Sequence, residues 1–275
     1  MAATTTVDVD AFWEDGYQVV RNVYSVQEIQ ELREDAYASK GRGGDLLSNP
    51  RLRRVLTDGR LVDIARQLLG QDEILYSGDS SFTINSNQNG FHKDNADRTD
   101  INAPDWQGRY TLLRFGIYLQ DHSRHTGGLN LRAKSHNTTS LAEGKNVYVQ
   151  TRVGDVGVWS LRTTHSGNGT LVRWPRQVHP EPKDVHNYAK WRIAKPDGDR
   201  IAVFAALGLD DHHTARYVEY LKTRTYMVGI WRKSEYDDEA LNEADKIGLN
   251  VRDVPREIEG DDTVGQNEKW IALPY

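Results

Sequence analysis

The chain has 275 residues, close to the upper limit of what one hydrophobic core supports. Its 35 Lys and Arg residues against 40 Asp and Glu give a formal net charge of −5, which argues against a nucleic-acid or anionic-membrane partner. Because cysteine is absent, disulfides and thiolate metal sites are excluded, and any metal must be bound by His, Asp or Glu. We therefore expect a single domain over 1–275 that acts on a small-molecule substrate.

The chain also lacks the signals that direct a protein into or across a membrane. No apolar run approaches the roughly 18 to 20 residues that a membrane helix needs. The first residues contain neither a basic segment nor an apolar segment of the kind found in export signals. We therefore expect a cytoplasmic protein.

The first quarter of the chain, 1–70, predicts a mostly helical part. A short helix is expected over 8–14 and a strand over 17–20. A second helix is then expected to begin at a capping box formed by Ser25 and Glu28. Two more helical segments are predicted over 50–56 and 61–69, the second ending at Gly70.

From residue 71 to about 235, the apolar pattern changes to a period of two. This period predicts short strands over 81–85, 113–119, 128–133, 147–151, 156–161, 201–207 and 226–231. One helix is predicted over 211–221, and the tail after Glu235 is expected to be rich in loops. Many short strands without intervening helices favour a mainly β sandwich or barrel, with the helices at its periphery.

Three residues form a candidate metal site. His92 and Asp94 are two residues apart in an extended segment, so their side chains point the same way. His165 follows the predicted strand over 156–161 across a short turn and is the best candidate for a third ligand. Two histidines and one carboxylate suit non-haem Fe(II), but zinc accepts the same ligands.

The order of several motifs resembles the phytanoyl-CoA dioxygenase family of iron(II)- and 2-oxoglutarate-dependent oxygenases. The matching residues are Phe12, Gly16-Tyr17, Val19 to Val23, His92-x-Asp94, Tyr118 to Asp121, Gly127 to Leu129, Ser135-His136, Gly154-Asp155 and His165. The resemblance implies a double-stranded β-helix, or jelly roll, similar to that of cupins, with helices packed on one sheet. It also implies Fe(II) bound by His92, Asp94 and His165, with 2-oxoglutarate and O2 as cosubstrates.

The same resemblance implies an arginine that binds the distal carboxylate of 2-oxoglutarate. Arg200 opens the predicted strand over 201–207 and is our preferred candidate, since a guanidinium matches the geometry of a carboxylate. Family members often have this arginine about a dozen residues after the second histidine, which would select Arg173 or Arg176 instead. Preferring Arg200 requires that 171–199 be an insertion.

Other polar residues near these positions are candidate cosubstrate contacts. Arg114 and Tyr118 alternate with apolar residues, so they face the barrel interior if the apolar side chains pack under the helices. Thr164 and Ser166 flank His165 and supply hydroxyls. The polar segment 89–106 is expected to form a loop over the barrel mouth, in which Asn95, Asp97 or Arg98 would contact substrate.

These features predict an oxygenase that hydroxylates a small polar metabolite and releases succinate and CO2. A carboxylate at Asp94 argues against halogenation, because related halogenases have Gly or Ala at this position. Two alternatives remain: a zinc-dependent hydrolase that uses the same three ligands, and a jelly-roll binding module without catalytic activity.

Overall fold

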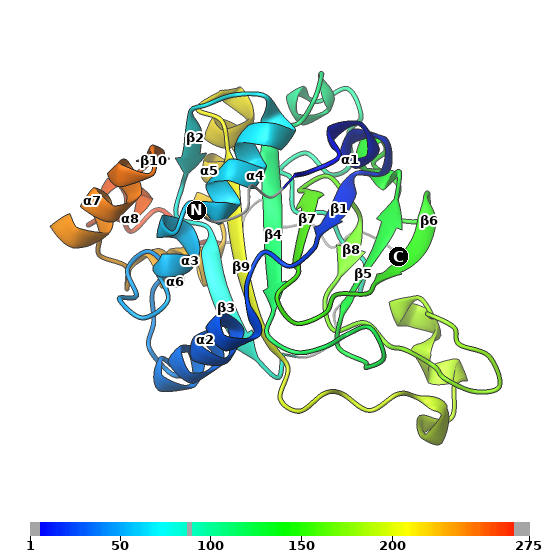
Figure 1. Cartoon of the computed structure of the whole chain (residues 1–275). Helices are drawn as coiled ribbons and strands as arrows, with labels where there is room; N and C mark the ends of the chain where they lie inside the picture. The colour runs from blue at the N-terminus through cyan, green and yellow to red at the C-terminus, as the bar shows by residue number, and fades with distance from the viewer. Residues whose placement is uncertain (1–5, 87–89, 267–275) are drawn as a thin grey trace.

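The computed structural model describes residues 6–86 and 90–266 of the chain (Figure 1). Its α-helices are α1 (Val9–Asp15), α2 (Val26–Ala38), α3 (Arg54–Thr57), α4 (Arg60–Leu69), α5 (His212–Lys222), α6 (Thr225–Trp231), α7 (Asp238–Lys246) and α8 (Val254–Glu257). Short 3-10 helices are η1 (Pro104–Trp106), η2 (Ser135–Asn137), η3 (Pro182–Asn187) and η4 (Lys190–Arg192). None of the helices in the described ranges is long and apolar enough to cross a membrane.

Two sheets face each other and form the jelly roll. Their strands are β1 (Tyr17–Val20), β2 (Ile74–Tyr76), β3 (Ser80–Ile84), β4 (Leu112–Tyr118), β5 (Leu129–Ala133), β6 (Lys145–Val149), β7 (Val156–Ser160), β8 (His165–Ser166), β9 (Ile201–Gly208) and β10 (Leu249–Val251). The larger sheet has the order β1-β7-β4-β9-β2-β10, and β3 also pairs with β9. The smaller sheet has the order β6-β5-β8. All pairs are antiparallel except that of β2 with β10.

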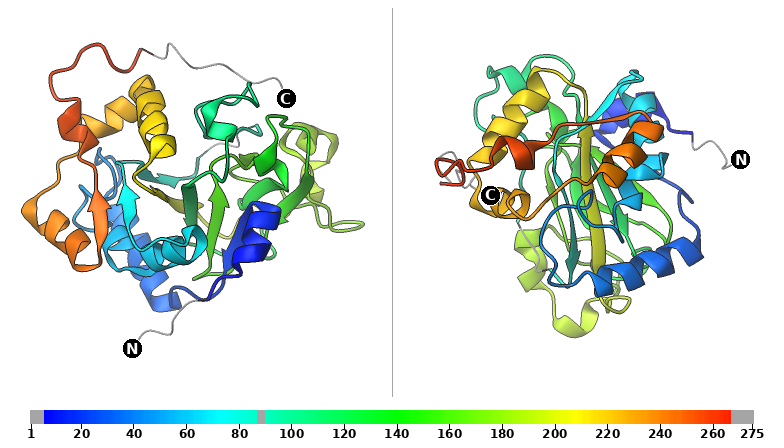
Figure 2. Two further views of the ribbon diagram at one scale, coloured as in Figure 1. Left: turned by 90° about the horizontal axis from the view of Figure 1, so that it is seen from above. Right: turned by 90° about the vertical axis from the view of Figure 1, so that its left-hand side faces the viewer.

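The N-terminal helices cover the outer face of the larger sheet. Phe115 and Ile117 of β4 and Val203 of β9 belong to the same buried cluster as Ile29 of α2 and Ile64 of α4. Figure 2 shows these helices on one side of the sheet and α5 on the other. The capping box at the start of α2 forms as predicted, with Ser25 and Glu28 bonded reciprocally. The predicted packing of helices on one sheet is therefore confirmed.

The inner face of the same sheet forms a second cluster with the smaller sheet. Tyr118 of β4, Trp159 of β7 and Ala202 of β9 pack with Leu129 and Leu131 of β5. Because side chains alternate along a strand, β4 directs its odd-numbered apolar residues to the helices and its even-numbered residues to the interior. This alternation sets the side chains that are available to a site between the sheets.

The C-terminal part differs from the sequence prediction in two respects. The segment predicted as a strand over 226–231 is helix α6, in which Met227, Val228 and Trp231 are buried. Within 236–266, the described part of the tail expected to be rich in loops, α7, β10 and α8 form between the loops. Asp237 caps α7, Ala240 and Ala244 bury one of its faces, and β10 adds a parallel strand beside β2.

Candidate metal centre and cosubstrate pocket

The backbone brings His92 and His165 together. Each amide donates a hydrogen bond to the carbonyl of the other residue, with N to O distances of 3.0 and 2.9 Å. The amide of Asp94 donates to Leu161 O at 3.0 Å, which attaches the segment again beyond the turn at 161–163. This bridge places side by side two segments that are 73 residues apart in the sequence.

The three side chains converge on one point. Asp94 Oδ1 lies 3.8 Å from His92 Nε2, and Asp94 Oδ2 lies 3.6 Å from His165 Nε2. Ligand atoms of the three residues all lie within 4.8 Å of one another. With metal–ligand bonds of about 2.0 to 2.2 Å, atoms at these separations fit around a single ion.

Each histidine presents its Nε2 atom to that point because its Nδ1 atom is already engaged. His92 Nδ1 lies 2.9 Å from Gly90 O, and His165 Nδ1 lies 3.0 Å from Thr163 O. A carbonyl only accepts hydrogen bonds, so Nδ1 carries the proton in both rings and Nε2 keeps its lone pair. Burial lowers the pKa of His165 to about 4, which keeps this ring neutral at pH 7.

A buried charge network holds the carboxylate of Asp94. Arg114 Nη2 lies 3.2 Å from Asp94 Oδ2 and 2.8 Å from Asp79 Oδ2. Tyr217 of α5 donates a hydrogen bond to Asp79 at 2.6 Å and accepts one from Arg114 at 3.0 Å. Burial alone would raise the pKa of Asp94, but its electrostatic interactions with the neighbouring His165, Arg114 and His92 outweigh burial and lower this pKa.

Arg200, the preferred candidate for the cosubstrate anchor, is buried beside Tyr118. Its Nε atom donates to Gly127 O at 2.6 Å and its Nη1 atom to Ser86 Oγ at 2.8 Å. Both acceptors are neutral, and no carboxylate within the described residues forms an ion pair with this guanidinium. Burial lowers the pKa of Arg200, because removing a cation from water without a counter-ion disfavours its charged form. Such a site fits a ligand carboxylate.

The interior beside Arg200 contains polar groups that a ligand could use. The guanidinium lies 5.5 Å from the centre of the Tyr118 ring, and burial raises the pKa of this phenol to about 12. Thr83 Oγ1 and Trp159 Nε1 are buried without a hydrogen-bond partner in the described part of the chain. The interior between the sheets therefore combines one cation with polar atoms that a bound 2-oxoglutarate could satisfy.

The remaining predicted cosubstrate residues lie elsewhere or are already occupied. His165 pairs with Leu131 of the interior cluster, so its neighbours Thr164 and Ser166 alternate to the opposite face, where Arg132 lies. Arg114 faces the interior as predicted but contacts two carboxylates. Arg173 and Arg176 are exposed, in the excursion between β8 and β9. The prediction that 171–199 is inserted between strands is consistent with this placement.

The segment 89–106 does form loops and η1, although Asn89 lies outside the described residues. Asn95 is buried and donates to Asp97 O at 2.8 Å, while the Asp97 carboxylate pairs with Arg216 of α5. Arg98 stacks on Tyr220 at 5.1 Å. Asn95 and Asp97 therefore tie the loop to itself and to α5, which leaves them poorly placed to contact substrate.

Two residues near the triad were not identified from the sequence. Asp79 and Tyr217 form the network behind Asp94. Asp79 lies just before a strand and Tyr217 is one of thirteen tyrosines, so neither position carries a local signal.

Comparison with known proteins identifies neighbours by structure alone. No protein-family model matches the chain, and no curated protein does. EctD from S. alaskensis, solved with 2-oxoglutarate and 5-hydroxyectoine, superimposes with a TM-score of 0.53 at 21% identity over 73% of this chain and 74% of that one.

Two enzymes of nogalamycin biosynthesis, both described as non-heme and alpha ketoglutarate dependent, are similar to the same extent. The epimerase SnoN has a TM-score of 0.52 at 17% identity over 73% of this chain and 81% of its own. The carbocyclase SnoK has a TM-score of 0.51 at 18% identity over 76% and 89%. At these identities, the likeness establishes the fold that the chain shares with them, the double-stranded β-helix.

Proposed function

We propose that the chain is an Fe(II)- and 2-oxoglutarate-dependent oxygenase that hydroxylates a small polar metabolite. The observation that carries the proposal is the convergence of His92, Asp94 and His165 at the edge of an interior that also holds Arg200. Two histidines and one carboxylate leave coordination positions open, which suits a metal that binds a cosubstrate and O2. The neighbours that depend on 2-oxoglutarate, or were solved with it, share this fold and support the proposal.

Each group has a distinct role in this proposal. His92 and His165 bind the metal through Nε2, with Nδ1 of each ring anchored to a carbonyl. Asp94 binds as an ionised carboxylate whose position Arg114 fixes. Arg200 binds the distal carboxylate of 2-oxoglutarate by a charge-assisted hydrogen bond, beside Tyr118. When bound, iron and 2-oxoglutarate supply the oxidative chemistry, with succinate and CO2 as products.

The closer relation to the phytanoyl-CoA dioxygenase family is part of the same proposal. It rests on the order of the motifs from Phe12 to His165 in the sequence. We leave Thr164 and Ser166 out of the proposed cosubstrate contacts, because both flank His165 on the opposite face. Hydroxylation is proposed as the outcome; the neighbours described as an epimerase and a carbocyclase use the same cosubstrate for other outcomes.

The direct test is an anaerobic titration with Fe(II) followed by 2-oxoglutarate. An Fe(II) chelate of this kind on a facial triad should give a weak absorption band at roughly 500 nm. His92→Ala or Asp94→Ala should abolish the band, whereas His179→Ala, in the excursion between β8 and β9, should leave it intact. A protein that binds zinc but forms no band, and releases no succinate with iron, would refute the oxygenase and favour a hydrolase.

A further inference from the structure

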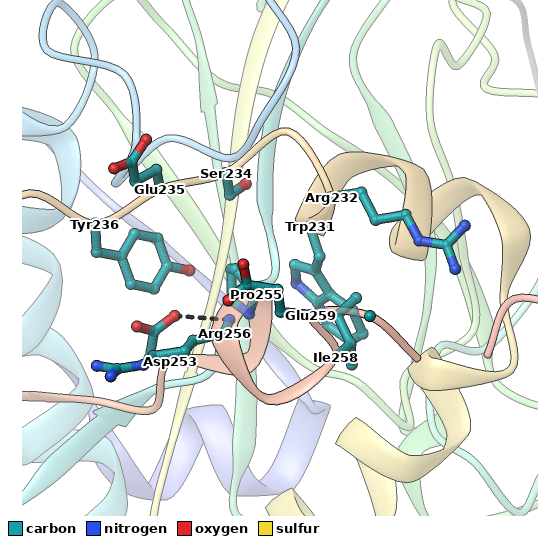
Figure 3. Close-up of a pocket in the computed structure, with 11 residues that line it drawn as sticks. Trp231, Arg232, Ser234, Glu235, Tyr236, Asp253, Pro255, Arg256, Ile258 and Glu259 are labelled. Atoms are coloured by element: carbon teal, nitrogen blue, oxygen red, sulfur yellow. Dashed lines mark hydrogen bonds between the residues drawn. The ribbon is translucent and has the colours of Figure 1, made fainter. Parts of the chain in front are cut away.

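Lys93, between the metal ligands His92 and Asp94, is the one buried lysine among the described residues, with 1% of its surface exposed. Other clusters of charge lie at the surface of the protein. In the pocket of about 610 Å³ drawn in Figure 3, for example, Arg232 and Glu235 are exposed and carry opposite charges. A lysine leaves water only at a cost in free energy. Its burial beside the triad therefore calls for a reason in the structure.

The side chain of Lys93 is held by backbone carbonyls. It points away from the two ligands, because side chains alternate along an extended segment. Its Nζ atom donates hydrogen bonds to Ser135 O at 2.7 Å and to Arg162 O at 2.8 Å. The ammonium also lies 5.7 Å from the centre of the Trp106 ring. Within the described residues no carboxylate forms an ion pair with it, so the two carbonyls are its main partners.

The three consecutive carbonyls of the turn 161–163 each hold a part of the metal site. Their partners are, in chain order, the amide of Asp94 at 3.0 Å, Nζ of Lys93 at 2.8 Å and Nδ1 of His165 at 3.0 Å. One short turn therefore fixes the backbone of the carboxylate ligand and the ring of the second histidine ligand. The lysine binds the turn at the carbonyl between these two contacts, so a shift of the turn would displace Asp94 and His165 together.

Ser135 adds a second contact between Lys93 and the segment of the second histidine. Its carbonyl accepts from Lys93, and its Oγ atom accepts at 2.9 Å from the amide of Thr164, the residue before His165. The same hydroxyl donates to the carbonyl of Arg132 on β5 at 2.7 Å, which fixes its direction. The lysine is thus bound to the segment of this ligand at two places.

We propose that Lys93 is a positioning residue, which fixes the segment of His92 and Asp94 relative to the turn that orients His165. The inference rests on the proposed metal centre and names a residue outside the triad that sets its geometry. An apolar side chain of the same size would avoid the burial of a cation. It would, however, leave two buried carbonyls without their donor and release the turn.

Two variants separate this role from a general contribution to stability. Lys93→Met has a side chain of similar length without a donor. Arg162→Met is the matched control, because the Arg162 guanidinium is a second buried cation on the Trp106 ring, 5.2 Å from its centre. It donates to two carbonyls as well, Asp105 O at 3.0 Å and Gly108 O at 3.3 Å. Neither of these carbonyls holds the triad, and the backbone carbonyl of residue 162 is kept in the control.

Anaerobic titrations with Fe(II) and with Co(II) measure the metal site directly. Co(II) is a useful probe because its visible spectrum depends on the arrangement of its ligands. In Lys93→Met the dissociation constants of both ions should rise about tenfold, and the Co(II) spectrum should differ from that of the wild type. Arg162→Met should lose stability to urea but keep the dissociation constants and the spectrum of the wild type. If both variants changed the metal site equally, or if neither did, Lys93 would have no positioning role.

Ser135→Ala supplies an independent variant should Lys93→Met not fold. It keeps the lysine and removes the hydroxyl that holds Thr164, so the dissociation constant of Fe(II) should rise by up to about tenfold. An unchanged constant in this variant would overturn the coupling between these segments.

Hydrogen exchange in the metal-free protein tests the same contacts without a metal. The amides of His92, Asp94 and His165 should exchange faster in Lys93→Met than in the wild type, and at the wild-type rate in Arg162→Met. Unchanged rates in Lys93→Met would overturn the proposal. If the wild type bound neither Fe(II) nor Co(II), the proposed oxygenase would fail, and the exchange rates would still decide whether Lys93 fixes these segments.

Discussion

The Nη2 atom of Arg114 lies 3.2 Å from Oδ2 of Asp94, the only carboxylate of the proposed metal triad. The same nitrogen lies 2.8 Å from Asp79, so one cation neutralises two buried carboxylates. The structure therefore assigns Arg114 a positioning role behind the metal ligand, whereas the sequence placed it among the cosubstrate contacts. Groups that orient metal ligands commonly matter almost as much as the ligands do.

Replacing Arg114 should therefore weaken metal binding. Arg114→Met leaves Asp79 and Asp94 as adjacent buried carboxylates without a cation, so we expect Fe(II) affinity to fall about 10- to 100-fold. Anaerobic titration of Fe(II) measures this change. Asp79→Asn with Arg114→Met should recover part of the loss because it removes the like charge. An unchanged dissociation constant in Arg114→Met would contradict the positioning role.

Arg200 should control the affinity for 2-oxoglutarate and not that for iron. Arg200→Ala removes a buried charge-assisted contact of roughly 1.5 to 3 kcal/mol, so KM for 2-oxoglutarate should rise by about one to two orders of magnitude. Arg173→Ala and Arg176→Ala serve as controls because both residues are exposed. In steady-state assays of succinate release, neither control should change KM for 2-oxoglutarate. If either control raised this KM strongly and Arg200→Ala did not, the anchor would lie in the excursion between β8 and β9.

Helix α6 shows why part of the fold escaped sequence-based prediction. Its segment, Thr225–Trp231, is rich in aromatic and branched residues, which favour strands. Met227, Val228 and Trp231 nevertheless bury one helical face against the cluster of Tyr217 and Leu221 on α5. Tertiary packing therefore overrode local propensity. The missed helix α7 is different, since its cap at Asp237 and the spacing of Ala240 and Ala244 were readable signals.

The candidate site was predictable where it depends on period and order along the chain. Alternation along β4 puts Tyr118 on the inner face, and Arg200, just before β9, lies beside its ring, because a strand has only two sides. The partners of Arg114 were not predictable. Arg114 lies on β4 and Tyr217 on α5, and only folding brings them together.

Trp231 should be one of the largest single contributors to stability around α6. Its side chain is fully buried, and its Nε1 atom donates to Gly78 O at 2.8 Å. Trp231→Ala creates a cavity and leaves that carbonyl without its donor, so the free energy of unfolding should fall by about 3 to 5 kcal/mol. Urea denaturation measures this loss. Exposed Trp191, in η4, is the matched control, and Trp191→Ala should cost less than about 0.5 kcal/mol.

The stability of the metal-free protein should decrease in acid because of His122. This ring is fully buried beside Arg200, and burial, followed by the charge of Arg200, lowers its pKa from 6.5 to about 3. Above pH 6.5 the ring is neutral in the folded and unfolded chains, so its contribution is constant. Between pH 6.5 and 3 only the unfolded chain binds the proton, so the free energy of unfolding falls by up to about 1.4 kcal/mol per pH unit.

His122→Gln removes this titration and keeps a polar group for Gln120, whose Nε2 lies 3.1 Å from Nε2 of the histidine. The variant should lose less stability than the wild type as the pH falls from 6 to 4. Urea unfolding of chelator-treated protein across that range gives both profiles. His136 and His165, whose pKa values burial lowers to about 4, titrate in both proteins, so they cancel in the difference. If the free energy of unfolding fell equally with pH in both proteins, protonated His122 would be tolerated beside Arg200. This result would contradict the buried environment without a counter-ion on which the proposed 2-oxoglutarate site depends.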